Sequence, residues 1–226
     1  MKQLLNNGAN PNATHKYEGL TPLHYACRMD APLNSGDLED CKKRKQRRSP
    51  KMRLDITRLL LRAAANPVCT DANGFIPLHY ACKYGFLEVA RLLLDRAPAR
   101  RNGTNAASSA CATAYDLTTP LHSLSQDPRP DWSEAGWFVS RFYKSCHRQL
   151  RRKQEKGEIA KLLIAAGANV RALDEDGCMP IEYARRYNYW DVVNVLKEHG
   201  GDNGLVPDEL SHYDSSSSEE DDPADF

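Results

Sequence analysis

The apolar residues of this chain recur in two short phrases that alternate from one end to the other. The first phrase, Pro-Leu-His-Tyr-Ala-Cys, starts at Pro22 and Pro77, and looser copies start at Pro120 and Pro180. The second places two large apolar residues before a small residue and an asparagine, as in residues 60–66 and 163–169. In both phrases the apolar residues follow the spacing of one helix face. The pattern predicts short amphipathic helices arranged in pairs, one pair per copy.

The spacing of the phrases is regular. The step from Ile76 to Ala97 has the same length as the step from Met179 to Gly200. The connecting step, from the end of the second phrase to the start of the next first phrase, has the same length from Ala64 to Ile76 as from Gly167 to Met179, whereas the step from Ala97 to Thr119 is about ten residues longer. Together the two steps give a period of about 33 residues, which is typical of a repeat built from a β-turn and two helices.

Two copies are longer than this period. The step within a copy is about twice its usual length from Thr21 to Ala64 and from Thr119 to Gly167. We therefore expect an insertion between the two helices of each of these copies.

Polar residues mark the predicted helix starts. Thr21 and Thr119 each precede a proline, which suits the first helical position, and their hydroxyls can cap the helix. Ile76 and Met179 hold the same position without a capping oxygen, which costs about 1 kcal/mol per helix. Acidic residues are expected in the first turn of the second helices, where the helix dipole favours them: Asp55, Glu88, Glu158 and Asp191.

These phrases and their period resemble the ankyrin-repeat family over most of residues 1–201. The resemblance implies an all-α solenoid of helix-turn-helix units joined by β-turn or hairpin loops. A partial repeat at 1–13 and repeats near 14–69, 70–102, 112–172 and 173–201 are expected. Insertions are expected at 30–53 and 125–156, and a disordered acidic tail at 202–226.

The resemblance also implies structural roles for residues of the first phrase. In ankyrin repeats its histidine ties the turn together by hydrogen bonds, so we expect buried structural histidines rather than metal ligands. The residues that define the repeats are then Thr21, His24, His79, Thr119, His122 and Gly167.

The family binds partner proteins on a concave face made of hairpin tips and the exposed ends of the first helices. The matching helix positions here are Arg28, Met29, Lys83, Tyr84, Gln126, Asp127, Arg186 and Tyr187. The matching tips are residues 16–18, 71–73 and 174–176. Because arginine and tyrosine contribute strongly to interfaces, a partner segment that is acidic or aromatic is expected.

Composition excludes several classes of protein. The sequence contains no run of about 18 apolar residues, so a membrane span is not predicted. The chain is expected in the cytoplasm, the nucleus or both. Seven cysteines without a C-x-x-C pair predict reduced thiols rather than disulfides or zinc ligands. No phosphate-binding glycine loop, nucleophile elbow or metal-spaced His/Glu pair is present, so we expect no catalysis, cofactor or metal.

Charge is unevenly distributed along the chain. The net charge is +1, but residues 202–226 carry nine acidic residues and no lysine or arginine, which leaves +10 on the rest. Six cations crowd into the first insertion: Lys42, Lys43, Arg44, Lys45, Arg47 and Arg48. Three interpretations stay open, namely a solvated loop, a nuclear-import signal for an import receptor, and a non-specific nucleic-acid contact. Phosphorylation of Ser49 would weaken either binding role.

The third copy's insertion and the tail add further candidates. Trp137, Phe138 and Phe142 fall near helical spacing among cations, which predicts a helix that packs on the array. A basic amphipathic helix for a calmodulin-like groove or an anionic membrane surface is the alternative. Phosphorylation by acidophilic kinases is expected in the tail, at Ser216, Ser217 and Ser218.

Together these features predict a non-enzymatic protein-interaction module or adaptor. The alternative is a nucleic-acid-associated nuclear regulator that uses the basic insertions.

Overall fold

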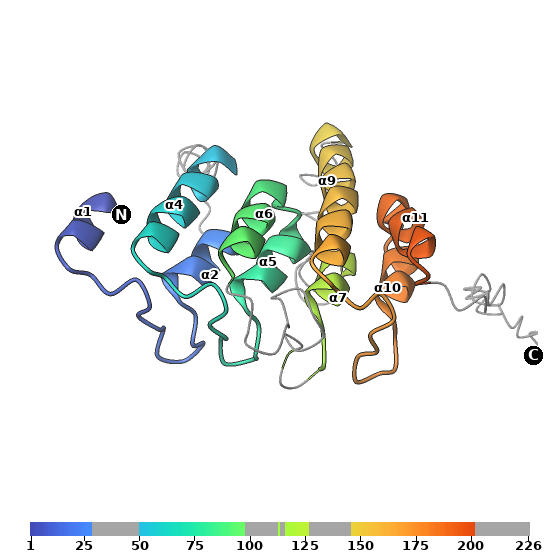
Figure 1. Ribbon diagram of the computed structural model, residues 1–226, viewed down its shortest axis with the longest axis horizontal. Coiled ribbons are helices and arrows are strands. Elements are labelled where there is room, and N and C mark those ends of the chain that lie inside the picture. Colours follow the sequence, from blue (N-terminus) through green and yellow to red (C-terminus); the bar gives the residue numbers. More distant parts are fainter. Residues whose placement is uncertain (29–49, 98–112, 114–115, 127–145, 202–226) are drawn as a thin grey trace, which may run out of the picture.

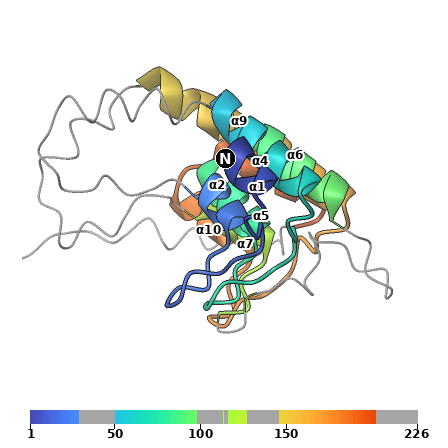
Figure 2. The same cartoon turned by 90° about the vertical axis from the view of Figure 1, so that its left-hand side faces the viewer.

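The computed structural model describes residues 1–28, 50–97, 113, 116–126 and 146–201. Their helices form two parallel rows, and loops project from one side (Figures 1 and 2). The inner row contains α2 (Pro22–Cys27), α5 (Pro77–Tyr84), α7 (Pro120–Ser125) and α10 (Pro180–Arg186). The outer row contains α1 (Lys2–Asn6), α4 (Pro50–Arg62), α6 (Leu87–Arg96), α9 (Cys146–Ala165) and α11 (Trp190–Glu198). The described residues include no strand, and the predicted all-α solenoid is confirmed.

One apolar residue from each phrase is completely buried in each full repeat. The inner helices contribute Leu23, Leu78, Leu121 and Ile181, and the outer helices contribute Leu60, Leu93, Leu163 and Leu196. All eight are at most 1% exposed. Because these residues recur at the same position of each repeat, one continuous core runs the length of the stack.

The loops before the inner helices form hairpins that bond to one another. The backbone N–H of Ala72 donates to Glu18 O at 3.0 Å, and the N–H of Glu175 donates to Asp116 O at 3.1 Å. Gly19 has φ +65°, and a Cβ there would lie 2.8 Å from the Ala72 nitrogen. The first two hairpins therefore contact each other through their backbones, which fixes the position of one tip relative to the other.

The outer helices of the two long repeats begin earlier than predicted. Helix α4 starts at Pro50 and α9 at Cys146, so both extend into the ranges predicted as insertions, 30–53 and 125–156. Asp55 and Glu158 therefore lie inside their helices, and their predicted place in the first turn is wrong. Glu88 and Asp191, in the repeats without insertions, do lie in the first turn.

Candidate partner-binding face

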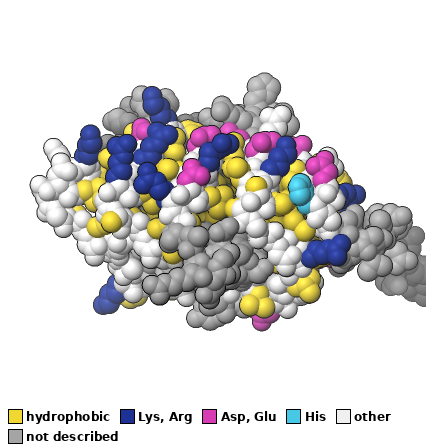
Figure 3. Space-filling view, viewed as in Figure 1, with side chains coloured by type: hydrophobic (Ala, Val, Ile, Leu, Met, Phe, Trp, Pro, Cys, Tyr) yellow, Lys and Arg dark blue, Asp and Glu magenta, His cyan; other side chains and the backbone are white. Residues whose placement is uncertain are grey.

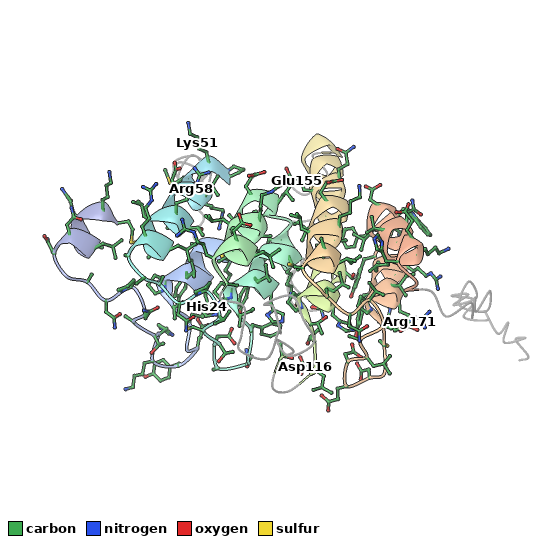
Figure 4. The ribbon with its side chains drawn as sticks, in the orientation of Figure 1. His24, Lys51, Arg58, Asp116, Glu155 and Arg171 are labelled. Atoms are coloured by element: carbon green, nitrogen blue, oxygen red, sulfur yellow. The ribbon has the colours of Figure 1, made fainter. Side chains whose placement is uncertain are left out.

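The buried histidines hold the inner helices against the hairpins that follow them (His24 in Figure 4). In His24, Nδ1 accepts from the Thr21 N–H at 3.1 Å, and Nε2 lies 3.0 Å from Phe75 O in the next hairpin. His79 and His122 repeat this pattern, with Nε2 at 3.2 Å from Thr118 O and 3.1 Å from Cys178 O. Since Nδ1 accepts, the proton of the neutral ring is on Nε2 and donates to the carbonyl.

Burial sets the charge state of these histidines. It lowers the pKa of His24, His79 and His122, and that of His79 falls to about 4. All three rings are therefore neutral near pH 7. Among the described residues, no group of three or more His, Cys, Asp or Glu side chains could hold a metal ion.

The fourth repeat uses a carboxylate in place of the histidine. Glu182 Oε2 accepts from the Met179 N–H at 2.7 Å, which is the bond that histidine Nδ1 accepts elsewhere. A carboxylate can accept a hydrogen bond from the backbone at the start of α10, but it cannot donate one to the hairpin of a following repeat. This fits the position of α10, which is the last inner helix described.

Two aspartates that were expected at hairpin tips point inward instead. Asp71 is 8% exposed; its Oδ1 accepts from the Asn73 and Phe75 N–H groups, and its Oδ2 from the Tyr80 hydroxyl at 2.6 Å. Asp174 is equally buried and accepts from the Tyr183 hydroxyl at 2.7 Å. The prediction that these two aspartates contact a partner is wrong, because their buried carboxylates accept hydrogen bonds from their own hairpin and from the tyrosine of the following helix.

The rest of the predicted tips reach the surface. In the first hairpin Lys16, Tyr17 and Glu18 are exposed, and the Lys16 Nζ lies 5.5 Å from the Tyr17 ring centre. In the other two predicted tips the exposed residues are Ala72, Asn73, Glu175 and Asp176. The line of tips therefore changes from a cation and an aromatic ring at its start to carboxylates at its end.

The predicted inner-helix residues lie at the ends of α2, α5 and α10. Arg28 is half-buried and its Nη1 is 3.6 Å from Glu18 Oε2. Lys83 and Tyr84 are half-buried at the end of α5. Arg186 is exposed, with its guanidinium 5.7 Å from the Tyr183 ring centre, and Tyr187 is half-buried beside it. A cation and a tyrosine are thus consecutive residues at the end of α5 and again at the end of α10.

One exposed apolar side chain of the hairpins, that of Leu117, was not predicted as part of this face. The side chain of Leu117 is 52% exposed. Leu117 has φ +51° and holds the position that Gly19, Gly74 and Gly177 occupy in the other hairpins. Aligning the hairpins would have found it, since leucine then stands alone among glycines. We call these hairpin and inner-helix-end residues the binding face: Tyr17, Arg28, Lys83, Tyr84, Leu117, Arg186 and Tyr187.

The outer helices form a separate face with charges of both signs (Figure 3). On α4, Lys51 and Arg58 are exposed (Figure 4). Glu158 and Asp191 line an open acidic groove between α9 and α11, together with Lys161, whose Nζ is 2.9 Å from Glu158 Oε1. Because the outer row separates this face from the hairpins, its residues provide controls for the binding face.

Several predicted residues lie outside the described part of the chain. They are Met29 and Asp127, the six cations at 42–48, Ser49, the aromatic residues of the third insertion at 137–142, and Ser216, Ser217 and Ser218. Within the described part, no helix has the length and apolar character needed to cross a lipid bilayer.

Comparison with known proteins identifies the repeats. Residues 49–127 match "Ankyrin repeats (3 copies)" and residues 18–72 match "Ankyrin repeat". The chain is also 28% identical over 148 residues to the potassium channel AKT2/3 of Arabidopsis thaliana. That alignment covers 63% of this chain and 17% of the channel, so the chain matches only a small part of that relative.

Proposed function

Because this chain is an ankyrin-repeat protein, we propose that it is a non-enzymatic adaptor that holds a segment of a partner protein on its binding face. Ankyrin repeats mediate protein–protein interaction. The observation that carries the proposal is the cation and tyrosine at the end of α5, repeated at the end of α10, beside exposed hairpin tips.

The side chains of the binding face favour a partner segment with acidic and aromatic residues. Lys83 and Arg186 attract carboxylates, and a guanidinium can hold a carboxylate through two hydrogen bonds. Tyr84 and Tyr187 offer rigid, amphipathic area that loses little conformational entropy on binding. Leu117 adds an exposed apolar contact on the hairpins.

Selection of short random peptides on the full chain tests the proposal. We expect the selected peptides to be enriched in Asp, Glu and aromatic residues. The double change Lys83→Glu with Arg186→Glu should weaken their binding by about tenfold or more, equivalent to about 1.4 kcal/mol.

A matched change on the outer face controls for net charge. Lys51→Glu with Arg58→Glu alters the charge equally but on α4, away from the hairpins. Peptide affinity should then stay within about twofold of the original. Equal losses from both double variants would indicate general charge attraction and would reject the binding face.

The finer predictions rest on sequence alone. Nuclear import through residues 42–48, phosphorylation at Ser49 and at 216–218, and the alternative of nucleic-acid binding all involve residues outside the described part. The salt dependence of binding distinguishes a protein adaptor from a nucleic-acid-binding protein, because contacts with phosphate weaken steeply as ionic strength rises.

A further inference from the structure

The repeats without insertions close their inner helices with a backbone hydrogen bond from a tight turn. In the second repeat, the Phe86 N–H donates to Ala81 O at 2.9 Å, and in the fourth the Tyr189 N–H donates to Ala184 O at 2.8 Å. The preceding residue is left-handed in both, at Gly85 with φ +69° and at Asn188 with φ +57°. This turn satisfies a carbonyl that the helix end would otherwise leave without a partner.

In the long repeats, a side chain takes over this hydrogen bond from the backbone. Arg53 and Lys156 hold the position of Phe86 and Tyr189, two helical turns before the buried leucine of the outer helix. Both lie inside their helices, so the chain does not turn at this point.

The carbonyls that these side chains reach are those of the closing turn. Arg53 Nη1 donates to Ala26 O at 3.1 Å and to Arg28 O at 2.7 Å. Lys156 Nζ donates to Leu124 O at 2.5 Å and to Gln126 O at 3.0 Å. Ala26 and Leu124 hold the repeat position of Ala81 and Ala184. The same carbonyl is therefore satisfied in all four repeats, by a backbone N–H in the short ones and by a cation in the long ones.

The aromatic residue of the next repeat contacts each cation. The Arg53 guanidinium lies 4.8 Å from the Phe86 ring centre, and the Lys156 Nζ lies 3.9 Å from that of Tyr189. Arg53 is 8% exposed and Lys156 is 2% exposed. A buried cation is costly unless hydrogen bonds and a polarised ring stabilise it, and here both are supplied.

We propose that Arg53 and Lys156 are positioning residues that replace the inter-helix turn, so that a repeat can carry a long insertion without loosening its helix pair. Each cation joins the end of an inner helix to its outer helix, whatever length of chain connects them. The short repeats have an aromatic residue at this position. A cation there instead predicts, from the sequence alone, that the repeat carries an insertion. The inference is independent of what the binding face holds.

The substitution Arg53→Phe, made in two backgrounds, tests the proposal. One background is the full chain. In the other, residues 29–52 are replaced by Tyr-Gly, the residues that precede Phe86. In the full chain, Arg53→Phe should lower Tm by about 5 °C, because two helix-end carbonyls lose their donor. With the short turn, the same substitution should leave Tm unchanged or raise it, because the backbone again closes the helix.

Two outcomes decide the matter. If Arg53→Phe lowers Tm equally in both backgrounds, the cation is an ordinary core residue and the proposal is overturned. If the effect depends on the insertion, it is supported. Should the full-length Arg53→Phe chain not fold, Arg53→Lys provides the second measurement, since Lys156 fills this role in the third repeat. A Tm within about 2 °C of the original supports the proposal, and loss of folding with lysine rejects it.

Discussion

At the scale of the residue, one backbone position in every described hairpin is left-handed, and in three hairpins it is glycine. Gly19, Gly74 and Gly177 have φ between +65° and +85°, where glycine avoids a Cβ clash. Leu117 adopts φ +51° at the same position and leaves about half of its side chain exposed. Such a residue costs about 1–2 kcal/mol relative to one in an allowed region. Strain of this kind is common at functional sites, which supports including Leu117 in the binding face.

Replacing Leu117 with glycine should therefore raise stability while weakening partner binding. Relief of the strained backbone should raise the free energy of unfolding by about 1 kcal/mol, measured by urea titration. Affinity for the selected peptides should fall, because the apolar contact is lost. Leu117→Ala is the matched control, since it removes the side chain but keeps the strain, so stability should not rise. A chain that is both more stable and unchanged in affinity would remove Leu117 from the binding face.

At the scale of the element, each full repeat satisfies the start of its inner helix with the side chain three residues after the cap. Histidine does so in three repeats and Glu182 in the fourth, through the 2.7 Å bond from the Met179 N–H. The sequence predicted part of this, since the threonines and prolines marked the helix starts. Met179 makes no side-chain cap hydrogen bond, as predicted, but the hydrogen bond from its backbone N–H to the Glu182 carboxylate was not predicted.

Substitution of Glu182 with alanine should destabilise the last helix pair. The Met179 N–H would lose its acceptor and the helix its favourable N-terminal charge, at a cost of about 1 kcal/mol. Hydrogen exchange at the amides of α10 and α11 should become faster, while exchange in α5 stays unchanged, because end repeats open locally. Glu175→Ala, in the exposed hairpin, is the control and should leave exchange at α10 unaltered. Uniform acceleration in all repeats would contradict a local role.

Helix length was the part of each element that sequence reasoning misjudged. The starts of α2 and α7 follow from two local signals, a threonine at the cap position and a proline, whereas the starts of α5 and α10 follow from the proline alone. Helices α4 and α9 extend beyond the repeat's usual limit: α4 already begins at Pro50, and α9 continues through Gly157, the residue after Lys156. The inward position of Asp71 was equally hidden, since it depends on the hydroxyl of Tyr80 in the following helix.

At the scale of the whole molecule, the repeats are joined by bonds that need a neutral imidazole. Each histidine connects its own inner helix to the hairpin of the next repeat, so three links run along the stack. The stacking itself could be predicted from the period, but the strength of the links depends on burial that only the structure shows. Desolvation lowers the pKa of His79 most clearly, to about 4, although Asp71 acts in the opposite direction.

The array should therefore lose stability as pH falls from about 6.5 towards 4. In this range the unfolded chain binds a proton at residue 79, near its ordinary pKa of 6.5, and the folded chain does not. Protons then favour unfolding, and His79 alone should reduce the free energy of unfolding by about 2 kcal/mol between pH 7.5 and pH 5. Urea titrations at the two pH values measure this loss, and His79→Gln should make it smaller by that amount. His15→Gln, which replaces an exposed histidine, is the comparison variant. If His79→Gln does not reduce the pH dependence, the imidazole at position 79 is not held neutral by the fold.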